Sequence, residues 1–141
     1  MIFFEEVVDL PVELDGLIED FISKSGEKER TVDSVKKQIR VILDEGNGKL
    51  WMVRSKGEAV GYFFAELVLA EYGSWLCLIH HVMVKKLTRS VLKDIDGTLE
   101  AWCREGGVGE MVFFTKRSSE ALIRSAKNGW DIDSVFMKRK V

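Results

Sequence analysis

Apolar residues recur along the chain in two different spacings, and each spacing predicts a type of element. Spacings of three and four residues predict amphipathic helices over residues 11–24, 31–45, 90–105 and 118–127. Short apolar runs bounded by turn residues predict strands over residues 2–8, 50–53, 59–69, 75–84, 111–115 and 130–140. The predicted order of elements is therefore β-α-α-β-β-β-α-β-α-β.

The lengths of the connections predict how these strands pair. Short turns join the strands over 50–53, 59–69 and 75–84, so these three should be antiparallel. A full helix separates 75–84 from 111–115, which lets these two strands lie parallel. We therefore predict an α/β (α+β) fold in which residues 1–141 form one domain with helices packed on a mixed sheet.

Charge and cysteine content narrow the class of protein. The 141 residues include 21 basic and 23 acidic side chains, and the formal net charge of −2 provides no positive field for nucleic acid. No apolar run reaches the roughly 18 residues that span a bilayer, and no basic region precedes the first apolar residues as in a signal peptide. Cys77 and Cys103 stand apart in apolar contexts, which predicts buried free thiols and a cytoplasmic protein. No cluster predicts a metal site.

Two short motifs stand at the ends of predicted elements. Residues 102–107 read Trp-Cys-Arg-Glu-Gly-Gly, and residues 128–133 read Asn-Gly-Trp-Asp-Ile-Asp. Together with the order of elements, these motifs resemble the GNAT superfamily of acyl-CoA-dependent N-acyltransferases over essentially the whole chain. The resemblance implies a mixed central sheet of about six to seven strands flanked by about four helices. It also implies acetyl-CoA as the cofactor and an amine-bearing small molecule or protein as the acceptor.

The resemblance places the cofactor at the turn that follows the predicted strand 75–84. The family's pattern, Arg/Gln-x-x-Gly-x-Gly/Ala, falls on residues 87–92, which read Leu-Thr-Arg-Ser-Val-Leu and lack both glycines. Glycines there let the backbone approach a pyrophosphate at the helix N-terminus. The resemblance still implies strand contacts to the pantetheine arm and turn contacts to the phosphates, from Val82, Met83, Val84, Lys85, Lys86, Arg89 and Ser90. A solvated basic turn is the alternative.

Side chains on neighbouring predicted strands are candidates for the base that deprotonates an amine. His80 and His81 are adjacent, so strand alternation predicts that they point to opposite faces, and we assign His81 to the cleft. Glu66 interrupts an apolar run and is the second candidate, with a place on a solvated face as the alternative. An asparagine and an acid tyrosine that the family often carries fall on Ser118 and Ser125, and serine is a poor general acid.

Two functions of different class follow. The first is an N-acetyltransferase-like enzyme with a degenerate cofactor turn and weak or absent catalysis. The second is a non-catalytic GNAT-like interaction or structural protein that acts through a protein partner or self-association. Small chains of this second kind are familiar among bacteriophage proteins, which adds a virion or assembly component to the hypotheses.

Overall fold

A computed structural model of the protein describes residues 1–25, 29–70 and 73–113. These residues form five strands and three helices: β1 (Ile2–Val7), α1 (Leu14–Ser25), α2 (Val32–Asp44), β2 (Gly48–Ser55), β3 (Glu58–Leu69), β4 (Trp75–Val84), α3 (Arg89–Glu105) and β5 (Met111–Phe113). The predicted order is confirmed as far as β5. The predicted helix over 118–127 and the strand over 130–140 lie outside the described residues.

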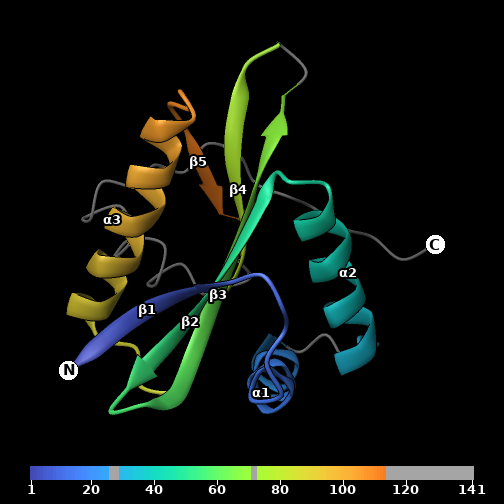
Figure 1. Ribbon diagram of the computed structural model, residues 1–141, viewed down its shortest axis with the longest axis vertical. Helices are drawn as coiled ribbons and strands as arrows, with labels where there is room; N and C mark the ends of the chain where they lie inside the picture. The colour runs from blue at the N-terminus through green and yellow to red at the C-terminus, as the bar shows by residue number, and fades with distance from the viewer. Residues whose placement is uncertain (26–28, 71–72, 114–141) are drawn as a thin grey trace.

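The five strands form one mixed sheet in the order β1-β2-β3-β4-β5 (Figure 1). Adjacent strands are antiparallel from β1 through β4, and β5 is parallel to β4. The antiparallel pairing of β2, β3 and β4 and the parallel pairing of β4 with β5 were predicted from connection lengths, because a tight turn can only reverse the chain whereas a helix can carry it back to the same end of the sheet. The fold class predicted from the sequence is confirmed.

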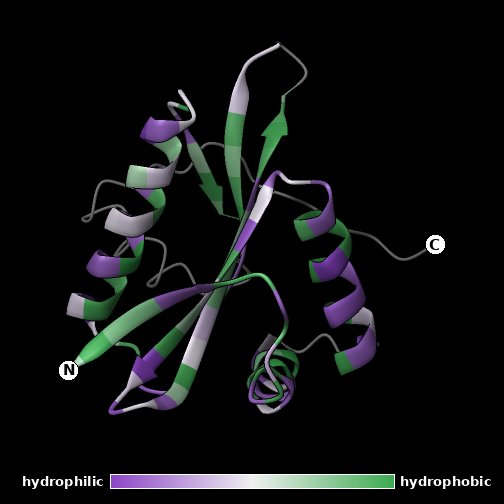
Figure 2. Ribbon diagram, viewed as in Figure 1, coloured by the Kyte–Doolittle hydropathy of each residue, from purple (hydrophilic) through white to green (hydrophobic). Residues whose placement is uncertain are grey.

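The helices cover both faces of this sheet. α1 and α2 pack on one face through Leu14, Ile18 and Ile39, which contact strand residues including Tyr62 and Phe64. On the opposite face, α3 contributes a second buried cluster with β2 to β5. Figure 1 shows α3 on one side of the sheet and α2 on the other, and Figure 2 shows the mixture of hydrophobic and hydrophilic residues along each helix. The sheet is therefore the middle layer of three.

The starts of two helices are fixed by threonine side chains. Thr31 accepts a hydrogen bond from the backbone N–H of Ser34, whose hydroxyl accepts one from the Thr31 N–H, and this capping box begins α2. Thr88 caps α3 by accepting from the Val91 N–H over 3.2 Å. The boundary at Thr88 leaves the preceding residues 85–87 as a short turn between β4 and α3.

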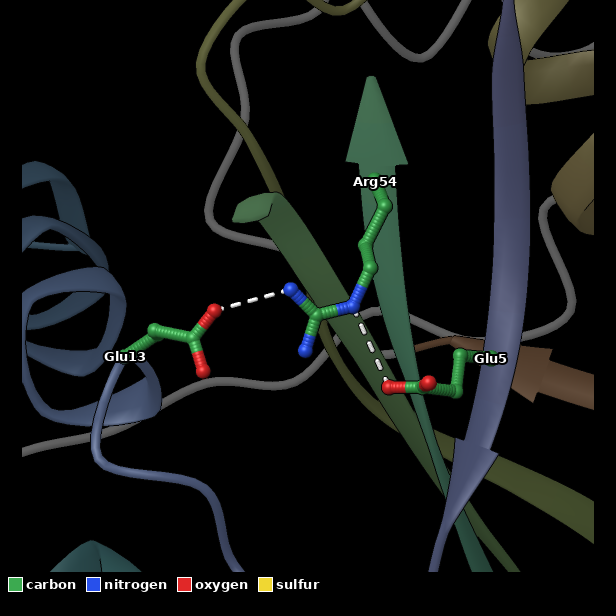
Figure 3. Close-up of polar contacts among 3 residues, drawn as sticks. All are labelled: Glu5, Glu13 and Arg54. Atoms are coloured by element: carbon green, nitrogen blue, oxygen red, sulfur yellow. Dashed lines mark hydrogen bonds and ion pairs between the residues drawn. The ribbon is translucent and has the colours of Figure 1, made fainter. Parts of the chain in front are cut away.

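Arg54 ties the first two strands to the segment that leads into α1 (Figure 3). Its Nε donates to Glu5 Oε1 on β1 over 3.1 Å, and its Nη1 donates to Glu13 Oε2 over 2.8 Å. The Arg54 guanidinium holds the pKa of Glu13 below its usual value, through the hydrogen bond and its charge. Because one planar side chain contacts both carboxylates, the orientation of α1 is coupled to the edge of the sheet.

Among the described helices, none is long and apolar enough to cross a membrane.

Candidate functional site

A β-bulge interrupts β4 at its centre. The pairing of β3 with β4 passes from Phe64 opposite His81 to Ala65 opposite Ile79, so no residue of β3 is paired with His80. On its other edge, β4 pairs with β5 from Cys77 opposite Met111 to Ile79 opposite Phe113. Bulges change the direction of side chains and are frequent beside active sites. The middle of β4 is therefore the place where its regular pairing with β3 is interrupted.

Glu66 and His80 form a hydrogen-bonded pair at this bulge. His80 Nε2 lies 2.8 Å from Glu66 Oε1, and the two side chains are 17% and 18% exposed. A carboxylate can only accept a hydrogen bond, so His80 carries its proton on Nε2 when the imidazole is neutral, and Nδ1 keeps a free lone pair. The His80 ring also stacks on Phe64, with ring centroids 5.1 Å apart. The imidazole is thus oriented by a carboxylate on one side and an aromatic ring on the other.

His81, the histidine chosen from the sequence as a base, lies in the core beneath α1. It is 2% exposed, its Nδ1 lies 3.1 Å from the Tyr62 hydroxyl, and its ring stacks on Phe21 of α1. Burial lowers the pKa of His81 to about 3, and the charge of Arg30 contributes in the same direction. Burial also raises the pKa of Tyr62, so its hydroxyl stays protonated, and it shares one hydrogen bond with His81 Nδ1. At neutral pH this pair is uncharged and structural in character.

The expectation that His80 and His81 point to opposite faces is wrong. His80 contacts Glu66 and Phe64, and His81 contacts Phe64 and Phe21. All of these contacts lie on the face of the sheet that α1 and α2 cover. The physical reason is the bulge, because an extra residue in β4 shifts the alternation by one and returns the second histidine to the same face.

The turn between β4 and α3 presents unpaired positive charge. Lys85, Lys86 and Arg89 are exposed, and no carboxylate of the described residues pairs with them. Within the same part of the chain, the backbone N–H groups of Arg89 and Ser90 donate to no protein acceptor, whereas the Val91 N–H is taken by Thr88. Two free N–H groups and three cations at a helix N-terminus are suited to an anion such as a phosphate.

The strand residues assigned to the pantetheine arm lie directly before this turn. Met83 and Val84 are buried on opposite faces of the sheet, and Val82 is partly buried. The side chains of these three residues therefore belong to the core, which leaves their backbone groups as the atoms that could contact a ligand. The strand pairs with β3 on its other edge, and the Lys85 N–H closes that ladder by donating to Val60 O over 2.9 Å.

The sequence reasoning missed the pairing of Glu66 with His80, although a signal was present. In the hairpin of β3 and β4, Glu66 lies opposite Leu78, so His80, two positions further along β4, is its diagonal neighbour on the same face.

Cys77 and Cys103 are free and buried, as predicted. Burial raises the pKa of the Cys77 thiol to about 12, which makes it a poor nucleophile. The described residues contain no group of ligands able to hold a metal ion.

Solved structures of acetyltransferases are similar to this protein over its whole length. No protein-family model matches the sequence, and no curated protein matches it either. The aminoglycoside acetyltransferase AAC(6')-Iy, solved with a CoA-containing bisubstrate analogue, is similar with a TM-score of 0.78 and 15% identity, covering 100% of this chain and 99% of its own. A ribosomal-protein-alanine N-acetyltransferase from Brucella melitensis is similar with a TM-score of 0.73 and 14% identity over 100% of both chains.

A third similar structure has a different description. It is a transcriptional regulator from Bacillus halodurans, with a TM-score of 0.79 and 16% identity over 100% of both chains. Identities this low establish a common fold and do not establish a common activity. The chain therefore has the fold of the GNAT acetyltransferases, and its activity must be argued from the Glu66 and His80 pair and the basic turn.

Proposed function

We propose that the protein is an acyl-CoA-dependent N-acyltransferase that transfers an acetyl group to an amine. The hydrogen-bonded pair of Glu66 and His80 carries this proposal, because it lies at the bulge in β4 and joins an imidazole to a carboxylate that orients it. The fold neighbours support it: one is described as a ribosomal-protein-alanine N-acetyltransferase, and AAC(6')-Iy was solved with a CoA-containing bisubstrate analogue. The acceptor would accordingly be an amine-bearing small molecule or protein.

Glu66 and His80 would remove the proton that an amine must lose before or during attack on the thioester. With Nε2–H donated to Glu66, the lone pair of His80 Nδ1 accepts this proton, and the carboxylate stabilises the imidazolium that forms. His81 is the weaker candidate for this role, because its pKa of about 3 leaves it without affinity for a proton at neutral pH. The attack would be direct, with no covalent enzyme intermediate.

The acyl carrier would be held on the other side of the bulge. Lys85, Lys86 and Arg89 would contact its phosphates together with the free N–H groups of Arg89 and Ser90, which fit the charge and hydrogen-bonding needs of a pyrophosphate. The backbone of Val82, Met83 and Val84 would run beside the pantetheine arm. Backbone N–H groups of β4 would polarise the thioester carbonyl.

The absence of glycines in this turn points to weak binding of the carrier. None of the residues 85–90 has a positive φ, so this stretch follows an ordinary backbone path with full side chains at every position. A phosphate would then be held by flexible lysine and arginine side chains more than by closely packed backbone. We expect low affinity and slow turnover, in keeping with the degenerate turn predicted from the sequence.

A non-catalytic domain is the second candidate, and one observation favours it. Thr88 already occupies the Val91 N–H, which removes one of the donors that a helix N-terminus offers to a phosphate. In that case the domain would act through a protein partner. The bacteriophage and virion associations predicted from the sequence stay predictions.

Calorimetry with acetyl-CoA at low ionic strength, followed by an assay of thiol release in the presence of amines, tests the proposal. Low salt preserves the phosphate contacts that screening would weaken. Micromolar to sub-millimolar binding with amine-dependent release of CoA would support the enzyme. Binding without thiol release for aminoglycosides, polyamines and peptide N-termini would favour the second candidate, and no binding up to millimolar acetyl-CoA would refute the enzyme.

A further inference from the structure

The end of the β3–β4 hairpin beyond Glu66 and His80 is apolar throughout. Residues 67–69 of β3 and 75–79 of β4 include no charged side chain. The pairing of β2 with β3 ends where Gly48 lies opposite Glu66, so β2 does not continue beside this end of the hairpin. Figure 1 shows the end of the hairpin extending past α2. The two ionisable side chains therefore lie at the border of an uncharged surface.

Three side chains of this end lie on the same face of the sheet as Glu66 and His80. Val68 follows Glu66 by two positions on β3, and it lies opposite Leu76. Leu78 lies opposite Glu66 and precedes His80 by two positions. We call Val68, Leu76 and Leu78 the apolar strip. Strand alternation thus produces one continuous surface in which the apolar strip adjoins the hydrogen-bonded pair.

The apolar strip belongs to neither of the two buried clusters. In the described ranges 1–25, 29–70 and 73–113, its side chains are not among those packed beneath α1 and α2 or beneath α3, and each is partly exposed. Ile42, the last buried residue of α2, lies over Gly48, because a Cβ atom at Gly48 would collide with the Ile42 side chain. α2 therefore borders the site at Gly48, and the apolar strip extends the site away from this helix.

The charge of this surface suits a ligand with a single amino group. Within residues 66–69 and 75–80, Glu66 is the only acidic side chain, and its carboxylate lies 2.8 Å from His80 Nε2. An acceptor with several ammonium groups would have to place the further charges against the apolar strip, and burying an unpaired charge is costly. An apolar substituent on the amine would instead be stabilised by contact with the strip.

We propose that the acceptor is a primary monoamine with an apolar substituent, and that the apolar strip determines this specificity. The inference rests on the proposed function, and it adds apolar monoamines to the acceptors to be assayed. The neutral amine forms a C–N bond with the acetyl carbonyl carbon, one of its protons passes to His80 Nδ1, and the C–S bond breaks with release of the CoA thiolate.

The length of the strip predicts the length of the substituent. Residues two positions apart on a strand are separated by about 7 Å, so a substituent of about this length reaches from His80 to Leu78. A substituent about twice as long reaches Leu76. Activity should therefore increase with the length of an unbranched apolar chain over this range.

Two amines of equal chain length test the inference with the full protein. Hexylamine and 1,6-diaminohexane differ by a second amino group at the far end, which is charged at neutral pH. Thiol release from acetyl-CoA should give a kcat/KM about tenfold or more higher for hexylamine, because the second charge of the diamine would lie against the apolar strip. Across ethylamine, butylamine and hexylamine, kcat/KM should rise about two- to fourfold for each methylene.

A carboxylate in the apolar strip should change this preference. Leu76→Glu places a negative charge where the far amino group of the diamine would lie, so it should shift the ratio of the two kcat/KM values about tenfold or more towards the diamine. Leu69→Glu is the matched control, because Leu69 is exposed at the same end of the hairpin and alternation directs it to the opposite face. A ratio of two substrates on one protein does not depend on the fraction that is folded.

Methyl NMR signals of the apolar strip report binding in the absence of turnover. Hexylamine should shift the signals of Val68, Leu76 and Leu78, and 1,6-diaminohexane should not. If amines are acetylated but the diamine reacts as well as hexylamine, or if Leu76→Glu leaves their ratio unchanged, the inference is overturned and the proposed function stands. Absence of thiol release with every amine refutes the proposed function. In that case, hexylamine-induced shifts confined to the strip would support it as a surface for apolar amines, and unchanged signals would overturn the inference too.

Discussion

His80 Nε2 lies 2.8 Å from Glu66 Oε1, across two strands and 14 positions apart in the sequence. This contact joins a proton acceptor to a group that orients it, which is the arrangement that general-base histidines need. It lies beside an irregularity in β4 and stays partly open to solvent. Next to it, His81 forms a hydrogen bond with Tyr62, and both of these side chains are almost fully buried. This difference in exposure between the two adjacent histidines is the reason that we propose the base role for His80 and not for His81.

The first prediction concerns the base. His80→Gln should lower turnover by about 10² to 10³ with little change in the KM for acetyl-CoA, because it removes the proton acceptor and leaves the phosphate site intact. Glu66→Gln should cost less, about tenfold, since it leaves the imidazole but removes its orienting charge. Steady-state rates with any amine that supports thiol release provide the measurement.

The tautomer of His80 can be measured by NMR without knowing which amine accepts the acetyl group. Nitrogen chemical shifts of His80 should identify the Nε2–H tautomer in the unsubstituted protein and a mixture of tautomers in Glu66→Gln. His81 is the internal control, since its environment is unchanged by the substitution. A His80 that carries its proton on Nδ1 would contradict the proposed direction of proton transfer.

The second prediction concerns the basic turn. The double variant Lys86→Ala/Arg89→Ala should weaken acetyl-CoA binding at least tenfold and flatten its dependence on salt, because two charge-assisted phosphate contacts are lost. Lys37→Ala/Arg40→Ala on α2 is a matched control, with the same change in charge, the same spacing and exposed positions. Equal affinities of the two variants in calorimetry would remove the phosphates from this turn.

Most of the fold could be predicted from the sequence because its signals are local. The helix that begins at Thr88 and the helix that begins at Thr31 each have a capping residue followed by apolar residues on one side. The antiparallel pairing of β2, β3 and β4 followed from connection lengths, since turns too short for any crossover join these strands. These features need no knowledge of distant contacts.

The site could be predicted only in part because it depends on a single inserted residue. Glu66 was identified as a candidate from its apolar surroundings, and the basic turn from its composition. The bulge at His80 was invisible, since two regular strands and a bulged pair have the same apolar pattern over a few residues. This shift of register places His80 beside Glu66, and it leaves His81, which we had assigned to the cleft, in the core.

The third prediction concerns pH. The folded pKa of His81, about 3, lies below the ordinary value of 6.5, so between these values the unfolded chain binds a proton that the folded chain does not. The free energy of unfolding should therefore fall as pH decreases through this range, by up to about 4 to 5 kcal/mol from this group, and level off below about pH 3. Urea unfolding at several pH values measures this slope.

The contribution of His81 can be separated from that of the carboxylates. The double variant Tyr62→Phe/His81→Phe removes the titrating group together with its hydrogen-bond partner, so no buried polar atom is left unpaired. Its stability should change less between pH 6.5 and pH 4 than that of the unsubstituted protein. Identical slopes for the two proteins would show that His81 is protonated in the folded state near its ordinary pKa.

The fourth prediction concerns Gly61 of β3, where the backbone of β4 leaves no room for a side chain. A Cβ atom at this position would lie 2.3 Å from the Met83 carbonyl oxygen and 2.8 Å from Val84 Cα, so Gly61→Ala must displace the end of β4. Overpacking of this kind costs about 1–3 kcal/mol of stability, and the displaced strand leads directly into the basic turn. We expect a lower urea midpoint and weaker acetyl-CoA binding together. Gly109→Ala, at a glycine with no atom within 4 Å, should change neither, and a Gly61→Ala protein of unchanged stability would contradict the close contact.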